Sequence, residues 1–290
     1  MKRAAMLVVI LALATLVSAQ NQTPPAQAGA AAPATPPVGK RPPQAKTQAE
    51  FDAYKVAAAE TTDGAALEKA ADDFAAKFPD SELRILLYRA AMHTYQTSNN
   101  SEKMMDMGRK VLKLDPDDPE ALVGVAQVLA ERTRETDLDK DQRLDEGTKL
   151  ALHAVETTDT DITVPPGTPQ DKIDAYKGFL RSNAYYVLGT IQYTREKYAE
   201  AEGYFHKSLD AFPSQPDPLA VLRLALSLDK QEKYAEALKY ANQAVQMTEA
   251  NQGSTLATLS RNERDRLVQL TGGTPAAKPP ASAQNPAPPK

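Results

Sequence analysis

The chain contains no cysteine and no tryptophan, and only three of its 290 residues are histidines. The absence of cysteine excludes disulfides, thiol catalysis and a lipid anchor attached to cysteine. His93, His153 and His206 lie far apart, without the His-Glu-x-x-His spacing of a zinc site. The sequence also lacks a Gly-x-Ser-x-Gly nucleophile elbow, a phosphate-binding loop and a Gly-x-Gly-x-x-Gly motif. We therefore expect a protein that is not an enzyme, with no catalytic residues, no cofactor and no metal site.

Basic charge is scarce in the middle of the chain. Residues 47–270 carry 27 basic and 38 acidic side chains, a net charge of −11, whereas the flanking segments carry only basic residues. Nucleic acid is bound by a positively charged face, so this acidic body argues against a nucleic-acid partner.

Large apolar side chains are rare toward both ends. Residues 20–46 and 271–290 consist mainly of Ala, Pro, Gln and Gly, and together they hold 13 of the 22 prolines. Such segments bury too little surface to offset their chain entropy. We expect a disordered Ala/Pro/Gln-rich linker over 20–46 and a disordered Pro/Ala-rich tail over 271–290.

The first 19 residues have the pattern of a secretory signal peptide. Lys2 and Arg3 precede an apolar stretch, and Val17-Ser18-Ala19 ends in the small residues of a cleavage site. The apolar stretch is shorter than the roughly 20 residues that span a membrane easily. We predict Sec-type export to the periplasm or the exterior, with cleavage after Ala19 and no membrane span afterwards. Retention of the segment as an anchor stays open.

The clearest positive signal is helical periodicity, and it is strongest between Ser182 and Gln215. Two amphipathic stretches there are separated by a turn at Glu196–Lys197, and Pro213 ends the second. The pattern resembles the tetratricopeptide repeat of 34 residues, in which a Trp, a Leu-Gly pair, an Ala, a Phe and a Pro occupy fixed positions. The corresponding residues here are Tyr185, Leu188, Gly189, Ala201, Phe205 and Pro213.

Weaker copies of the pattern fill most of the chain. The tract Lys-Tyr-Ala-Glu-Ala occurs at 197–201 and again at 233–237, which fixes the register. We predict helical units at about 48–81, 85–118, 119–158, 182–215 and 218–251, followed by a capping helix over 254–270. The resemblance implies an all-α fold over 47–270: a right-handed α-α superhelix, or solenoid, of about five helix pairs, with disordered ends.

The third unit departs from the pattern. Its two helices are separated by an acidic insertion over 132–143, after which a long helix should start near Gln170. Asp137, Asp139 and Asp141 imitate the start of a calcium-binding loop, but Gln142 occupies the position of the Gly that makes its sharp turn. We therefore interpret these aspartates as helix capping and surface charge, and not as a calcium site. Whether the insertion is a contact or a spacer stays open.

Proteins with this repeat bind partners through an inner, concave groove lined by the first helix of each unit. The resemblance implies a protein-binding groove formed by positions on the second, third and fourth units: Arg89, His93, Gln96, Gln127, Tyr186, Thr190 and Tyr193.

We expect a non-catalytic scaffold of the cell envelope that binds a protein or peptide whose identity the sequence does not reveal. Two alternatives stay open: a structural subunit of an envelope assembly, and an enzyme built on a helical array that acts on envelope polymers. The enzyme would need two carboxylates, or a histidine and an acid, facing each other in the groove.

Overall fold

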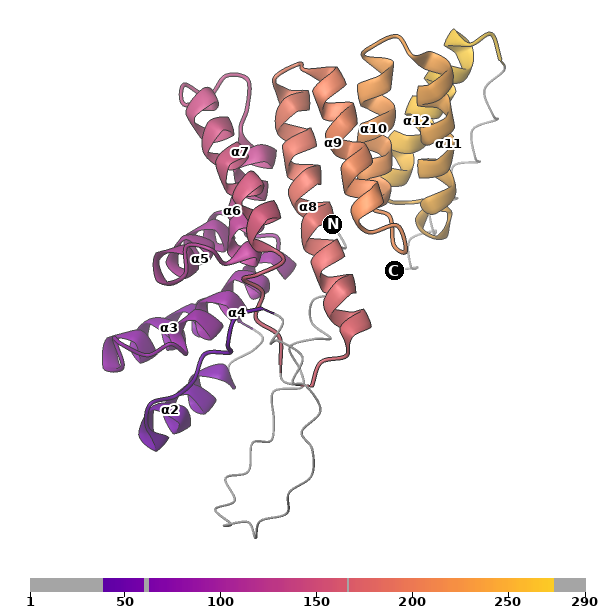
Figure 1. The fold of residues 1–290 in the computed structure, drawn as a ribbon. Coiled ribbons are helices and arrows are strands. Elements are labelled where there is room, and N and C mark those ends of the chain that lie inside the picture. The colour runs from indigo at the N-terminus through magenta and orange to yellow at the C-terminus, as the bar shows by residue number, and fades with distance from the viewer. Residues whose placement is uncertain (1–38, 60–62, 166, 274–290) are drawn as a thin grey trace, which may run out of the picture.

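A computed structural model describes residues 39–59, 63–165 and 167–273 (Figure 1). This part of the chain contains eleven α-helices and no strand, which confirms the predicted all-α fold. The helices, in chain order, are α2 (Gln48–Ala58), α3 (Gly64–Lys77), α4 (Arg84–Thr97), α5 (Ser101–Leu114), α6 (Pro119–Arg132), α7 (Lys140–Thr157), α8 (Gln170–Thr194), α9 (Tyr198–Ala211), α10 (Pro218–Asp229), α11 (Tyr234–Met247) and α12 (Thr255–Leu270). A short 3₁₀ turn, η2 (Glu249–Asn251), precedes α12. The predicted signal peptide lies outside the described residues.

Local signals explain where several helices begin. Asp118 and Asp217 cap α6 and α10, and each is followed by a proline in the first turn, where the missing N–H costs nothing. Thr47 caps α2 in the same way by accepting the backbone N–H of Glu50. The ends of these helices are therefore encoded by a few neighbouring residues.

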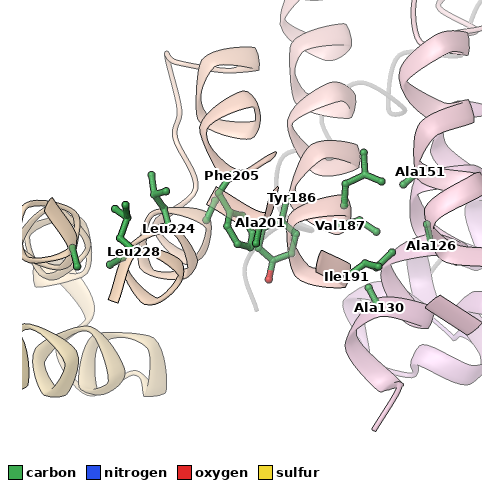
Figure 2. Close-up of a cluster of buried hydrophobic side chains, with 14 of the residues drawn as sticks. Ala126, Ala130, Ala151, Tyr186, Val187, Ile191, Ala201, Phe205, Leu224 and Leu228 are labelled. Atoms are coloured by element: carbon green, nitrogen blue, oxygen red, sulfur yellow. The ribbon is translucent and has the colours of Figure 1, made fainter. Parts of the chain in front are cut away.

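Consecutive helices pack as antiparallel pairs, and the pairs stack into one array that runs from α2 to α12 (Figure 1). Close approach within the α8–α9 pair depends on Gly189, because a Cβ atom there would lie 2.7 Å from the ring of Phe205. Figure 2 shows Phe205 next to Tyr186, while Val187 and Ile191 point toward the alanines of α6 and α7. The apolar stripe of each pair is thus covered by its neighbour, as in other solenoids.

Helix α8 is the longest element, with 25 residues, and it extends well past α9 (Figure 1). Its first turns place Ile173, Tyr176 and Leu180 against Ile162 in the connection that precedes the helix. The extension also reaches back to α6, two elements earlier in the chain. It therefore fastens the third pair to the fourth. No helix in the described ranges has the length and apolar character needed to span a membrane.

Residues 39–46 differ from the disordered linker that we expected. Arg41 pairs with Glu82 at 2.7 Å, and Lys40 contacts both Asp115 and Asp161 at 2.7 Å. Ala45 packs against the core cluster of the first two pairs. Composition is a poor guide here because the segment is held by ion pairs to the array and needs no core of its own. The rest of the predicted linker and most of the predicted tail lie outside the described residues.

Candidate functional site

One side of the array is formed by the first helices of successive pairs. Helix α6 lies against α8, α8 touches α10, and α10 touches α12. Second helices of neighbouring pairs touch mainly through side chains, as Arg109 does with Glu146 and His206 with Tyr240. The backbones of these first helices approach one another more closely, so the first helices line the inner side of the curve. All seven predicted groove residues lie on α4, α6 or α8.

Three of the predicted groove residues are not exposed on this side. Tyr186 is 1% exposed and packs its ring against Phe205, 6.0 Å away, and Thr190 is 3% exposed. Arg89 is 8% exposed. The expected exposure was wrong because the pairs pack so closely that these positions fall inside the core. His93, Gln96, Gln127 and Tyr193 are partly exposed.

Arg89 belongs to a buried polar cluster that joins three helices. On the α4 side, its guanidinium pairs with Asp118, the residue that caps α6, and its Nε lies 3.3 Å from Glu120. His93 Nε2 lies 3.2 Å from the same Glu120 carboxylate. From the extension of α8, the Tyr176 hydroxyl donates a hydrogen bond to the other Glu120 oxygen. We call Arg89, His93, Asp118, Glu120 and Tyr176 the α4–α6–α8 cluster.

Burial and neighbouring charges oppose each other in setting the pKa values of this cluster. Burial alone would raise the pKa of Glu120, but His93 and Arg89 outweigh it and lower the value to about 2. Burial alone would lower the pKa of His93, but the Glu120 carboxylate outweighs it and raises the pKa. For Asp118, burial dominates over the attraction of Arg89 and raises the pKa.

The cluster contains the pairing of a histidine with an acid that an enzyme in the groove would require. Its carboxylates are nevertheless enclosed, with Asp118 at 1% and Glu120 at 8% exposure. Both Glu120 oxygens are occupied by Tyr176, His93 and Arg89, so no free base faces the groove. We interpret the cluster as a joint between helices. Sequence reasoning missed Asp118, Glu120 and Tyr176 because up to 87 residues separate its members along the chain.

The accessible part of the inner side lies farther along the array. Tyr193, at the end of α8, is partly exposed and packs edge-on against Tyr198 with 5.3 Å between ring centroids. Arg223 of α10 lies over the Tyr193 ring, 5.6 Å from its centroid. In the part of the chain that the structure describes, Arg223 forms no ion pair. Burial raises the pKa of Tyr193, and the charge of Arg223 opposes that rise. We call Tyr193, Tyr198 and Arg223 the Tyr193 site.

Charged residues of helices α10 and α12 flank this part of the array. Arg266 of α12 pairs with Asp229 at the end of α10 and with Glu263, 3.1 Å away. The pair with Asp229 holds the capping helix against α10, whereas the pair with Glu263 lies within α12. Tyr193 and Arg223 take no part in these ion pairs, and both side chains are partly exposed.

The other two histidines and the acidic insertion each contact residues in their own part of the array. His153 is 40% exposed and lies 2.7 Å from Asp117, while the ring of His206 packs edge-on against Tyr240. The carboxylate of Asp137 accepts the backbone N–H of Arg134. Across residues 39–59, 63–165 and 167–273, no three His, Asp or Glu side chains are arranged to hold a metal ion.

Comparison with known proteins agrees with the repeat pattern. The family model for the tetratricopeptide repeat matches residues 186–254, so this part of the chain is built of such repeats. The Tyr193 site lies within it. Such arrays present extended concave surfaces for binding other proteins, so the chain has the general character of a protein-interaction scaffold.

Solved structures with helical arrays are only distantly similar. BtubC (BKLC) from P. vanneervenii is 14% identical with a TM-score of 0.42, covering 84% of this chain and 100% of that one. Acl4, an assembly chaperone of RpL4, is 14% identical with a TM-score of 0.38, covering 77% and 97%. PilW, a type IV pilus biogenesis factor, is 17% identical with a TM-score of 0.36, covering 73% and 98%. No curated protein sequence matches the chain.

Proposed function

We propose that this protein is a non-catalytic scaffold of the cell envelope that binds a protein or peptide partner at the Tyr193 site. The observation that carries the proposal is the partly exposed arrangement of Tyr193 and Arg223 on the first helices α8 and α10, with Tyr198 beside them at the start of α9. Tyrosine and arginine are among the residues that contribute most to protein–protein binding energy.

The geometry of the site suits recognition of a polypeptide. The two tyrosine rings are held edge to face, so little side-chain entropy is lost when a partner packs on them. Arg223 is placed by its contact with the Tyr193 ring, yet its guanidinium keeps its donors for a carbonyl or carboxylate of the partner. The site therefore combines an apolar anchor with a charged, directional group.

The envelope location rests on the signal-peptide pattern of the first 19 residues. It is tested by fractionating the native cells and determining the N-terminus of the mature protein by mass spectrometry. We expect the protein in the periplasm or medium, with Gln20 as its first residue. Recovery from the cytosol with Met1 intact would contradict the proposed location and leave the binding proposal unaffected.

The binding proposal is tested with purified wild-type protein and three variants as bait in extracts of the native envelope. We expect Tyr193→Ala and Arg223→Ala each to reduce capture of the partner about tenfold, as for central interface residues. Tyr204→Ala is a matched control, because Tyr204 is also a partly exposed tyrosine under a cation, Lys207, but lies on the second helix α9. If all four baits capture the same proteins in the same amounts, the Tyr193 site is not the binding surface.

A further inference from the structure

We propose that the insertion in the third pair builds a second binding site, which takes a short segment of a partner protein that carries both an acidic and a basic side chain. The site is a cleft of about 860 Å³ at the turn end of the α5, α6 and α7 helices. It is separate from the Tyr193 site, and the inference does not depend on the function proposed above.

One wall of the cleft is basic. Arg132 ends α6, Arg134 lies in the insertion, and Arg143 lies in the first half of α7. None of the three forms an ion pair within residues 39–59, 63–165 and 167–273, whereas other arginines, such as Arg109 and Arg195, pair with carboxylates of neighbouring helices.

Local hydrogen bonding explains why these arginines stay unpaired. Asp137, the acid of the insertion that lines the cleft, accepts the backbone N–H of Arg134 through its carboxylate at 2.8 Å, and the Asp137 N–H donates to the Arg134 carbonyl. Arg132 donates only to the hydroxyl of Ser101, 2.9 Å away. Arg143 Nε is buried and has no hydrogen-bond partner in the described structure. A buried donor without an acceptor costs free energy, which a ligand that accepts from it would recover.

The opposite wall is acidic. Glu102 and Asp106 are one turn apart on α5, line the same cleft and are exposed. Neither forms an ion pair in the part of the chain that the structure describes, although Arg132, Arg134 and Arg143 line the facing wall. Arg132 reaches α5 at the Ser101 hydroxyl and not at these carboxylates, so a ligand that carries both charges can pair with both sets of side chains.

The remaining lining fits a peptide. Met105 and Val128 supply an apolar surface, and Asn99 and Asn100 supply amide groups that can bond a peptide backbone. A nucleic acid is disfavoured because Glu102 and Asp106 would repel its phosphates, and residues 47–270 carry a net charge of −11. The cleft therefore suits a peptide segment whose carboxylate pairs with the arginines and whose basic side chain pairs with the acidic residues of α5.

The test measures binding of a fluorescein-labelled, eight-residue peptide in which Glu and Lys alternate, by fluorescence anisotropy with the full-length protein. Unlabelled peptides of the same length that alternate Glu with Gln, or Lys with Gln, serve as competitors. We expect the Glu/Lys peptide to compete about fivefold better than either, since each exposed ion pair contributes up to about 1 kcal/mol.

Variants then assign the two walls. We expect R134Q/R143Q and E102Q/D106N each to weaken binding about fivefold or more, whereas R261Q and E249Q should bind as the wild type does. Arg261 and Glu249 are matched controls because they also lack ion pairs in the described ranges but lie outside the cleft. If R143Q lowers the melting temperature, the single variant R134Q replaces the double variant in the binding test, because Arg134 is exposed and its substitution should leave the fold intact.

The inference is overturned if the Glu/Lys peptide does not bind the wild-type protein, or if it binds the two double variants as tightly. Equal competition by the Glu/Gln peptide would also overturn it, because the acidic wall would then make no contribution. A Tyr193→Ala variant should bind the peptide normally, which separates this result from the test of the Tyr193 site.

Discussion

At the scale of single residues, the α4–α6–α8 cluster makes Arg89 the side chain whose loss should be most costly. Its removal leaves Asp118 and Glu120 buried without their counter-charge. Breaking a buried pair in this way typically destabilises a protein by about 3–5 kcal/mol. We expect Arg89→Ala to lower the free energy of unfolding by that amount in urea denaturation. Lys69→Ala, which removes the exposed pair with Asp73, is the control and should cost at most about 0.5 kcal/mol. Similar losses in both variants would contradict the assigned role of the cluster.

His93 makes the stability of the protein depend on pH. Its pKa in the folded state is raised above the ordinary value of 6.5, so folding favours the protonated ring. His93 therefore contributes its full stabilisation to the free energy of unfolding below about pH 6.5. This stabilisation is lost as the pH rises through the folded-state pKa of His93. We expect the urea midpoint of the wild type to fall on going from pH 6 to about pH 9, and the midpoint of His93→Gln to fall less. An identical pH dependence in both proteins would show that His93 does not carry the effect.

At the scale of elements, the turns of three helix pairs, α4–α5, α8–α9 and α10–α11, share an unusual backbone conformation. Asn99, Glu196 and Glu232 have φ angles of 58°, 60° and 61°, in the left-handed region. In each turn the next residue donates its N–H to a carbonyl five positions earlier, as in a Schellman motif: Asn100 to Tyr95, Lys197 to Gln192 and Lys233 to Leu228. The 36-residue spacing of Glu196 and Glu232 equals that of the Lys-Tyr-Ala-Glu-Ala tracts.

These turns carry a strain that glycine would relieve. A residue with a Cβ atom pays roughly 1–2 kcal/mol in the left-handed region, whereas glycine does not. We expect Glu196→Gly and Glu232→Gly each to stabilise the protein by about 1 kcal/mol in thermal or urea unfolding. Lys239→Gly, at an exposed position inside α11, should instead destabilise it by a similar amount. A loss of stability in the turn variants would mean that the glutamate side chains contribute to the turns.

At the scale of the whole molecule, residues 39–46 connect successive pairs along one edge of the array. Arg41 bonds Glu82 between α3 and α4, while Lys40 bridges Asp115 after α5 and Asp161 after α7. The Lys40 N–H also donates to the Ile162 carbonyl at 2.9 Å. The connections α3–α4, α5–α6 and α7–α8 thus all bond to one short segment. In a repeat array, by contrast, each unit ordinarily contacts only its neighbours.

Loss of Lys40 should therefore loosen connections that are far apart in the sequence. We expect Lys40→Ala to destabilise the protein by about 1 kcal/mol, less at high salt because these contacts are partly exposed. Hydrogen exchange should increase in the connections around Asp115 and Asp161 together. Lys55→Ala, which removes an exposed pair within α2, should leave both connections unchanged. Faster exchange at only one of them would contradict the role of the segment as a tie.

The inner surface could be predicted from the sequence only in part. Tyr193 is partly exposed on the first helix α8, but Tyr186, seven residues earlier on the same helix, is buried against Phe205. Helical periodicity gives the side of a helix on which a residue lies, and it does not say how closely the next helix approaches. Arg223 was missed because its role comes from its contact with Tyr193, on the preceding first helix.

The helices and their pairing are encoded locally in the chain, by apolar spacing, by Asp118 and Asp217 as caps, by prolines after helix ends, and by small residues such as Gly189 where helices cross. Which charged side chains meet depends instead on how the helix pairs stack in three dimensions. Arg89, Glu120 and Tyr176 come from three helices, Lys40 contacts aspartates 75 and 121 residues away, and the cleft beside the insertion is shaped by α5, α6 and α7 together. Such contacts depend on the stacking angle between pairs, which arises from the packing of many side chains at once and leaves no periodic trace in the sequence.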